Sequence, residues 1–238
     1  IIFASKDDNI AIWQTNKLIP KWDLQGRFIM DGSNPKHDWK EKLPIKHQPH
    51  SLNPSRGFLS SANQNPVDSN YPYYVPGDYA PPFRGARIDQ ILPTLKNATY
   101  DDLRKIQIDN KSLLAQRTVP ALLKTIDKSN LSEEQIKIYD ELSSWDYFYN
   151  PDSKAPIIFN AWMKNIAKNT WHDELGDADE DVEWPNYRTL SDLIVNDPES
   201  KWFNKTNTSN LETLNEISQA AFEVETINLI NEFYKLTN

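Results

Sequence analysis

The stretch Gly57–Leu92 has side chains that indicate a functional site rather than packing. Three amide side chains, at residues 63–65, stand at the end of a short apolar run, and Pro66 ends any strand pairing there. A carboxamide held rigidly at such a place donates hydrogen bonds without titrating. Further along, Arg84 and Arg87 lie near the start of a predicted helix, where their charges oppose the helix dipole. We therefore expect a role for these cations other than helix stability.

Two predicted elements would position these groups. Residues 57–62 form an apolar run with the length and flanks of a buried strand, which places the amides at a strand end. Residues 83–92 carry apolar side chains at positions 88, 91 and 92, which predicts a helix. A loop rich in Tyr and Pro connects the two.

Proline and glycine divide the chain into two regions. Eleven of the 16 prolines and five of the six glycines fall within residues 1–95, which favours strands and turns there and helices afterwards. Apolar runs at residues 1–3 and 10–14 predict a β-hairpin. Residues 15–56 show neither the helical period of 3.6 residues nor the strand period of 2, so we predict an ordered connector there. We predict an α-rich α+β fold, with a strand- and loop-rich part over residues 1–83 and a helical region over residues 84–238.

Capping patterns predict where the later helices begin. Thr99 with Asp102, and Ser132 with Gln135, have the reciprocal spacing of a capping box. The first of these helices could continue to Val119, where Pro120 must end or kink it.

Two further helices are predicted to open at Asp152-Ser153 and at Ser209 with Glu212. The apolar stripe expected to be buried in the former is Phe159, Trp162, Met163 and Ile166. The stripe expected in the latter is Leu214, Ile217, Ala221, Val224, Ile227 and Tyr234.

Short motifs occur along the chain in an order that resembles the β-chain of the penicillin acylase family. They are Asn53-Pro54, Gly57-Phe58, Ala62-Asn63, Tyr71-Pro72, Phe83-Arg84 and Arg87-Ile88. The flanks extend the match over nearly the whole chain, with Asp8 to Ala11, Ile19-Pro20, Asp31-Gly32, Ile106 to Asp109, Leu142 to Asp146 and Leu211 to Thr213. This family comprises N-terminal-nucleophile amidohydrolases, among them penicillin amidases and acyl-homoserine-lactone acylases. The resemblance implies that the small sheet is a remnant of their αββα core.

The resemblance implies roles for two residues. Asn63 would be the oxyanion-hole donor, which stabilises the charged oxygen of the tetrahedral intermediate in amide hydrolysis. Arg84 would orient Asn63 or the catalytic α-amine, with Arg87 as the alternative for that role. Apart from the resemblance, an Asn at this place is also a common turn former, and the arginines could pair with carboxylates such as Asp89 or Asp78.

The resemblance also implies that a catalytic group is missing. In the family, the nucleophile is the first residue of the β-chain, usually Ser, whereas this chain begins with Ile1. We expect an internal fragment that is inactive alone, with the remaining α- and β-chain segments of one precursor as partners and a small acyl amide as substrate. The alternative is a non-catalytic helical interaction module, for which Asn63 and Arg84 would lie far apart.

Aromatic residues between the prolines are candidates for substrate binding. An acyl pocket could be lined by Tyr71, Tyr74 and Phe83, together with Tyr73 and Tyr79, or the same rings could pin the loop to the body of the protein. The sequence does not choose between these two interpretations.

We predict no cofactor and no metal site in this chain. The histidines at 37, 47 and 50 lack the spacing of a zinc site. The acidic run 173–183 has Val182 where a calcium loop needs Gly, which favours a solvated loop. The family's calcium ligands would lie mostly outside this chain, with the carbonyl region of Gly26 as the nearby candidate.

Charge and composition exclude some functions. The net charge of -8 and the pI of about 5.1 argue against nucleic acid or an anionic membrane as a partner, since both need a basic face. No apolar run reaches the roughly 18 residues of a membrane span. The absence of cysteine excludes disulfides and a Cys nucleophile. The resemblance, rather than composition, implies a periplasmic or secreted protein.

Overall fold

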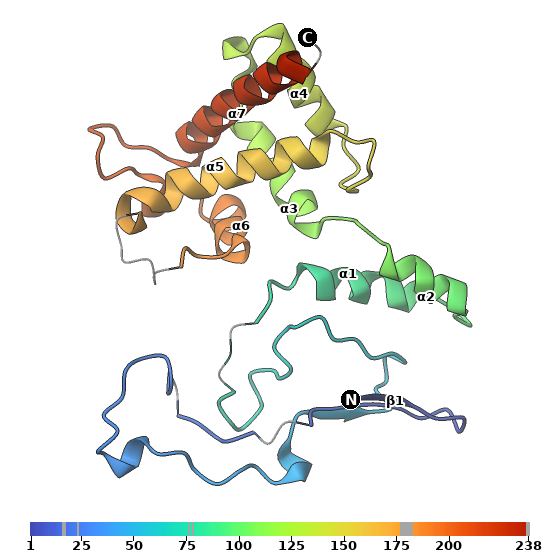
Figure 1. Cartoon of the computed structure of the whole chain (residues 1–238). Helices are drawn as coiled ribbons and strands as arrows, with labels where there is room; N and C mark the ends of the chain where they lie inside the picture. The colour runs from blue at the N-terminus through green and yellow to red at the C-terminus, as the bar shows by residue number, and fades with distance from the viewer. Residues whose placement is uncertain (16–17, 23, 76, 78, 177–182, 237–238) are drawn as a thin grey trace. The chain divides into compact units, whose positions relative to one another are not determined.

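A computed structural model describes residues 1–15, 18–22, 24–75, 77, 79–176 and 183–236, with the side chains of 232–236 left out. The chain forms two compact units, Ile1–Leu103 and Arg104–Asn238. Figure 1 shows strands, loops and one complete α-helix in the first unit, and mainly helices in the second. The boundary predicted from composition, between residues 83 and 84, lies about twenty residues before the boundary between the units. The segment between the two boundaries is helical but belongs to the unit that contains the strands.

A three-stranded antiparallel sheet forms part of the first unit. Strands β1 (Ile2–Ala4), β2 (Ile10–Trp13) and β3 (His50–Leu52) lie in the order β1-β2-β3. The predicted hairpin is confirmed, with Phe3 opposite Ala11. The third strand comes from the segment expected to be a connector, and it pairs Ala11 with Leu52. Helices and a small antiparallel sheet together confirm the α+β class.

The apolar run 57–62 is not a strand, so that prediction was wrong. The backbone of this run forms hydrogen bonds with nearby side chains and not with a neighbouring strand. The Phe58 carbonyl accepts a hydrogen bond from Arg56 Nε at 3.1 Å, and the Ala62 amide donates to Gln64 Oε1 at 2.5 Å. A short apolar run cannot distinguish a strand from a loop whose backbone is bonded in this way.

Two helices follow in or across the first unit. Helix α1 (Phe83–Ile91) confirms the helix predicted over residues 83–92. Helix α2 (Tyr100–Gln107) begins where predicted, because Asp102 Oδ2 accepts from the Thr99 amide at 2.9 Å and Thr99 Oγ1 accepts from the Asp102 amide. It does not continue to Val119, since the chain starts a new helix after the Ser112 cap.

The second unit is helical. Its α-helices are α3 (Leu113–Leu122), α4 (Glu133–Ser143), α5 (Ala155–Leu175), α6 (Tyr187–Asn196) and α7 (Leu214–Leu236). Helix α5 packs along α7, and α3 packs against α6 (Figure 1). Short 3-10 helices lie at Pro35–His37, Ile45–His47, Leu92–Thr94, Leu123–Thr125, Lys128–Asn130 and Lys201–Phe203.

The starts of three of these helices test the capping predictions. The capping box of Ser132 and Gln135 is confirmed at α4. Helix α5 begins at Ala155, two residues after the predicted start, without a side-chain cap. The predicted start at Ser209 with Glu212 was wrong, because Glu212 accepts from Thr208 and Lys205 in the preceding loop.

Helix α7 begins instead at Leu214, directly after Thr213, whose hydroxyl donates at 2.6 Å to the carboxylate of Glu216 in the first turn. Its expected stripe is correct for the first three members only. Leu214, Ile217 and Ala221 are buried, whereas Val224 and Ile227 are about half exposed. The stripe turns toward Phe222 and Thr226, and the Tyr234 side chain lies outside the described part.

The core of the second unit is built around α5 and α7, with further buried residues from α3, α4 and α6. All four predicted stripe residues of α5 are buried, and Trp162 donates to the Ser218 carbonyl at 3.0 Å. The fully buried large side chains include Trp162, Trp171, Phe159, Phe203, Phe222, Leu122 and Leu142. The stripe of α5 is therefore buried as predicted.

Candidate functional site

Asn63 and Arg84 are in direct contact. Arg84, in the first turn of α1, donates from Nη2 to Asn63 Oδ1 at 2.8 Å and lies 3.5 Å from the Ala62 carbonyl oxygen. A guanidinium on the carbonyl end of a carboxamide fixes which end is nitrogen and which is oxygen. The pair predicted from residues far apart in sequence therefore meets in space, whereas a helical interaction module would have left the two apart.

The backbone of Asn63 is held in an unusual conformation. Its φ angle is +63°, in the left-handed region that Asn tolerates better than most residues. Its carbonyl oxygen accepts from the Ala80 amide at 2.9 Å. Backbone and side chain are thus both fixed, by Ala80 and by Arg84, so the direction of the amide nitrogen is set before any ligand binds.

A groove lies beside the Asn63 side chain. Its volume is about 650 Å³, and its lining residues include Trp13, His50, Leu59, Asn63 and Tyr79. Asn63 is exposed, and among the described residues none accepts a hydrogen bond from its Nδ2. Since Oδ1 is bound to Arg84, the two N–H groups are available to a ligand oxygen in the groove. A cation on Oδ1 also polarises the amide and strengthens those donors.

Tyr79, one of the aromatic residues considered for an acyl pocket, lines this groove. Its hydroxyl donates to the Val75 carbonyl at 3.4 Å. Partial burial and the neighbouring Tyr74 raise the pKa of Tyr79, so its hydroxyl stays protonated at neutral pH.

Three of the other aromatic candidates, Tyr71, Tyr74 and Phe83, lie elsewhere in the first unit. Tyr71 lines a separate groove and donates from its hydroxyl to the His47 carbonyl at 2.6 Å. Tyr74 forms an antiparallel bridge with Lys21, and Phe83 is the first residue of α1. These contacts of Tyr71 and Tyr74 are those of residues that pin a loop. A substrate role for the three residues stays a prediction.

The alternatives considered for the arginines have separate positions. Arg87 donates to Gln90 on its own helix at 3.4 Å. Asp89 pairs with Arg56 at 3.4 Å rather than with either predicted arginine, and Asp78 lies outside the described residues. Arg84 is therefore the arginine found on Asn63.

The candidate metal ligands do not converge among the described residues, where no group of three or more His, Asp or Glu side chains could hold an ion. His37 Nδ1 lies 2.9 Å from the Asp31 carbonyl oxygen, His47 Nδ1 lies 2.6 Å from the Tyr73 hydroxyl, and His50 stacks on Trp13. The acidic residues 177–182, considered above as a loop, lie outside the described part.

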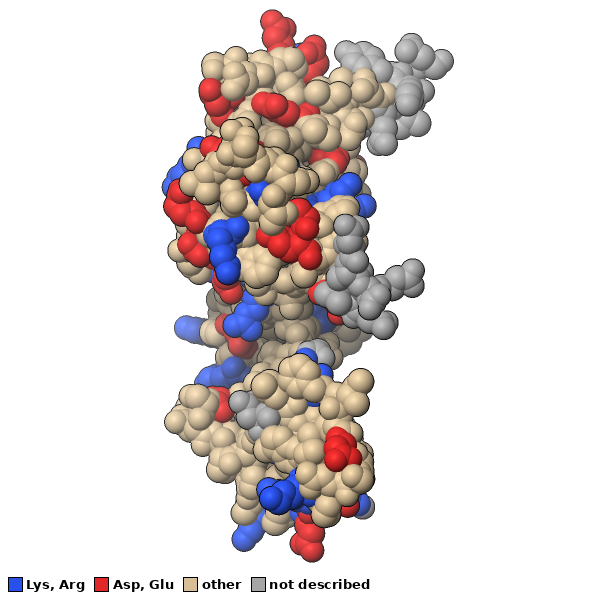
Figure 2. Space-filling view, turned by 90° about the vertical axis from the view of Figure 1, so that its left-hand side faces the viewer, with Lys and Arg blue, Asp and Glu red and all other residues tan. Residues whose placement is uncertain are grey.

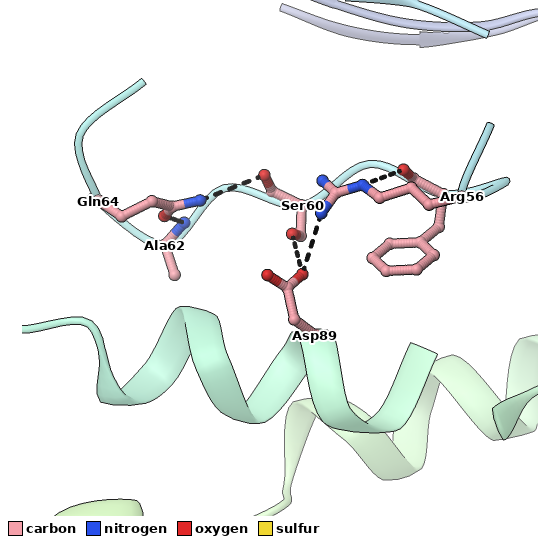
Figure 3. Close-up of polar contacts among 6 residues, drawn as sticks. Arg56, Ser60, Ala62, Gln64 and Asp89 are labelled. Atoms are coloured by element: carbon pink, nitrogen blue, oxygen red, sulfur yellow. Dashed lines mark hydrogen bonds and ion pairs between the residues drawn. The ribbon is translucent and has the colours of Figure 1, made fainter. Parts of the chain in front are cut away.

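Sequence reasoning missed a second set of contacts beside Asn63. Asp89 of α1 accepts from Ser60 Oγ at 3.0 Å and from Arg56 Nη1 at 3.4 Å (Figure 3). The Gln64 side chain turns back along the loop, with Oε1 on the Ala62 amide and Nε2 3.5 Å from the Ser60 carbonyl oxygen. These pairs are far apart in sequence or follow no recognised motif, so no local pattern indicated them.

The charged side chains show no dominant sign on the surface in view. In Figure 2, acidic and basic side chains are interspersed among uncharged areas on both units. In the described part of the chain, none of the helices has the length and hydropathy needed to cross a membrane.

Comparison with known proteins identifies the family of the chain. The model of the penicillin amidase family matches residues 1–236. The chain belongs to the penicillin amidase family. This confirms the family that the sequence motifs indicated.

Individual relatives share about a quarter of the aligned residues. Penicillin acylase 2 proenzyme of a Pseudomonas species (strain SE83) is 25% identical over 143 residues, covering 60% of this chain and 18% of the relative. The acyl-homoserine lactone acylase QuiP of Pseudomonas aeruginosa is 26% identical over 195 residues, which cover 75% of this chain and 22% of the relative. QuiP of Pseudomonas fluorescens is 23% identical over 187 residues, which cover 74% of this chain and 23% of the relative. The chain thus spans about a fifth of the length of these relatives.

Proposed function

We propose that this chain is an internal part of the β-chain of a longer penicillin-acylase-like amidohydrolase, which cleaves a linear amide between an acyl group and an amine. Asn63 supplies the oxyanion-hole donor, and Arg84 orients it. The observation that carries this proposal is the 2.8 Å contact from Arg84 Nη2 to Asn63 Oδ1, which leaves Nδ2 available beside a groove. Family membership supports the reaction class.

The chemistry follows from the oriented amide. Attack on an amide carbonyl converts its oxygen into an oxyanion, and donors fixed beforehand stabilise it without reorganisation. One such donor is worth about 3 kcal/mol in the transition state. Arg84 contributes by holding Oδ1, so both N–H groups of Asn63 stay directed away from the guanidinium.

The remaining catalytic groups come from other segments of the same precursor in this proposal. A hydroxyl nucleophile, with its own α-amine as base, would be supplied by the N-terminal residue of the full β-chain. The three-stranded sheet is then part of the αββα core of an N-terminal-nucleophile hydrolase. The protein is exported to the periplasm or secreted, which fractionation of the native host would test.

The test uses the longer gene product after its natural processing, assayed with p-nitroanilides of acyl groups of graded length. We expect Asn63→Gly to lower kcat by two to three orders of magnitude with little change in KM. Glycine is preferred to alanine here because a φ of +63° penalises alanine, which would add backbone strain to the loss of the amide.

A matched control is available in the same unit. Asn97 is also exposed and also has a positive φ, of +51°, so Asn97→Gly makes the same change of residue type and backbone freedom. It should leave kcat within about twofold. Near-normal activity of Asn63→Gly would exclude the proposed role. Hydrolysis by the purified 238-residue chain alone would exclude the proposed division of the active site.

A further inference from the structure

We infer that Asp89 is a positioning residue for the oxyanion donor, acting through the loop that carries Asn63. This inference rests on the proposed function, because it assigns Asp89 a role in the same site. Asp89 touches neither the groove nor Asn63. Its carboxylate instead holds Ser60 and Arg56, which lie three and seven residues before Asn63 (Figure 3).

The loop depends on such contacts because no strand holds it. Residues 57–62 have no ladder partner in the sheet, so no pairing register fixes how far along the loop Asn63 lies. A shift of one residue in an extended segment moves each side chain by about 3.3 Å. A displacement of that size would separate Asn63 from Arg84.

Helix α1 holds the loop at two points. Asp89 anchors Ser60 near the end of the helix, and Arg84 anchors Ala62 and Asn63 near its start. The loop therefore runs antiparallel to the helix. Five helical residues rise about 7.5 Å, while three extended residues reach about 10 Å. The two spans are comparable, and the Gln64 side chain folds back onto Ala62 and Ser60 within this segment.

The close approach of loop and helix agrees with this arrangement. Gly85 is buried between the two anchors, and a β-carbon there would lie 3.6 Å from Gln64 Oε1 and 3.9 Å from the Ala62 β-carbon. The loop is thus packed on the helix surface between Arg84 and Asp89. Ala62 is itself buried, with 7% of its surface exposed.

The contacts of Asp89 are too exposed to be explained by stability. The side chains of Arg56 and Asp89 are 45% and 46% exposed, and an ion pair of that exposure contributes little to folding. Arg56 is itself held in place, since its Nε donates to the Phe58 carbonyl and its guanidinium lies 4.4 Å from the Phe58 ring. Asp89 therefore contacts an arginine whose own position is fixed, which suits a role in orienting the loop.

The experiment is a double-mutant cycle in the longer, processed protein, again with acyl p-nitroanilides. Asp89→Ala should lower kcat about tenfold and leave KM within twofold, because a misplaced oxyanion donor loses its effect in the transition state. In the Asn63→Gly background, Asp89→Ala should change kcat by less than about twofold, since the donor that it positions is absent. A merely structural role would lower kcat by the same factor in both backgrounds.

Two further variants keep the test decisive. Asp89→Asn retains an acceptor for Ser60 Oγ and loses the charge opposite Arg56, so it should lose less activity than Asp89→Ala. Glu41→Ala removes an exposed carboxylate elsewhere in the first unit and should leave kcat unchanged. If Asp89→Ala does not fold, Asp89→Asn with Ser60→Ala replaces it in the cycle and should show the tenfold loss.

The outcomes separate the two proposals. If Asn63→Gly lowers kcat as expected while the Asp89 variants keep full activity, the positioning role is wrong and the proposed function stands. Equal losses from Asp89→Ala in both backgrounds also overturn the positioning role. If Asn63→Gly keeps activity, the proposed function fails and the role of Asp89 fails with it.

Discussion

The two units of this chain are stabilised in different ways. Among the described residues, the buried hydrophobic side chains of the first unit are Leu43 and Ala62, whereas the second unit buries twenty. The first unit instead exposes large apolar residues, among them Ile2, Phe28, Ile29 and Trp39. Its loops are held by individual polar contacts. The candidate site lies in this first unit.

This difference shows how a site can be ordered without a core of its own. In the second unit, apolar stripes on α5 and α7 close on each other, and burial of their area supplies the stability. In the first unit, Arg84 and Asp89 place one loop on one helix, and each contact is weak alone. Precise placement of Asn63 therefore depends on several polar groups acting together.

The largest expected effect tests the comparison between the units directly. Trp162 is fully buried, packs on Phe222 at 4.9 Å between ring centres, and donates to Ser218. Trp162→Ala should destabilise the 238-residue chain by about 3–5 kcal/mol, measured by denaturant unfolding followed by far-UV circular dichroism.

The matched control is the same substitution in the other unit. Trp39 is 66% exposed, so Trp39→Ala should cost less than about 1 kcal/mol in the same experiment. Similar losses from both variants would contradict the division into a unit with a core and a unit without one.

The next effect compares two arginines of α1 in the longer, processed protein. Arg84→Lys keeps the charge but loses the planar donor group on Asn63 and Ala62, so kcat should fall roughly ten- to a hundredfold. Arg87→Lys should have a much smaller effect, because Arg87 donates to Gln90. A larger loss for Arg87→Lys in steady-state kinetics would reverse the assignment between them.

A smaller effect is expected at the cap of α4. Ser132→Ala removes the acceptor for the Gln135 amide and should destabilise the second unit by about 1 kcal/mol in the same unfolding assay. Ser143→Ala, at the exposed end of that helix, is the control and should be nearly neutral. Equal effects would show that the cap contributes nothing specific.

The smallest effect depends on pH. The Thr213 hydroxyl and amide donate to Glu216 and lower the pKa of that carboxyl. Because the folded-state pKa is lowered, the contribution is present above the ordinary Glu pKa of about 4.3 and is lost as the pH falls through the lowered value.

Glu216→Gln should therefore be less stable than the wild type at pH 7, by under about 0.5 kcal/mol because the group is exposed. The difference should vanish in acid, where both side chains are uncharged. A difference that grows as the pH falls would contradict this sign. Unfolding curves measured from pH 7 downward into acid, until the difference between the two proteins no longer changes, provide the measurement.

Local signals were sufficient to predict several elements of the fold. The hairpin of β1 and β2, helix α1, and the caps at Thr99 and Ser132 all depend on residues within a few positions of one another. The strand β3 and the helix α6 were not predicted. The strand has only three residues, too few for a periodic pattern. The N-cap of α6, Asn186, directly follows Pro185 and the acidic run, where the surrounding residues favour a loop.

The site was predictable to a lesser degree. Asn63 and Arg84 were found through a resemblance of motifs, and their contact has no local sequence pattern. The contacts of Asp89 with Ser60 and Arg56 are equally non-local, and the apolar run that contains Ser60 suggested a strand. Composition alone cannot show that a helix, rather than a sheet, holds this loop.

The pairing of β2 with β3 gives the protein an optical probe of its groove. Trp13 and His50 are opposite each other in the sheet and stack with ring centroids 4.0 Å apart and 14° between their planes. Both residues line the groove beside Asn63. A ligand that enters the groove changes the surroundings of this indole. A change in the emission of the eight tryptophans that disappears in Trp13→Phe would therefore report occupancy without a label or turnover.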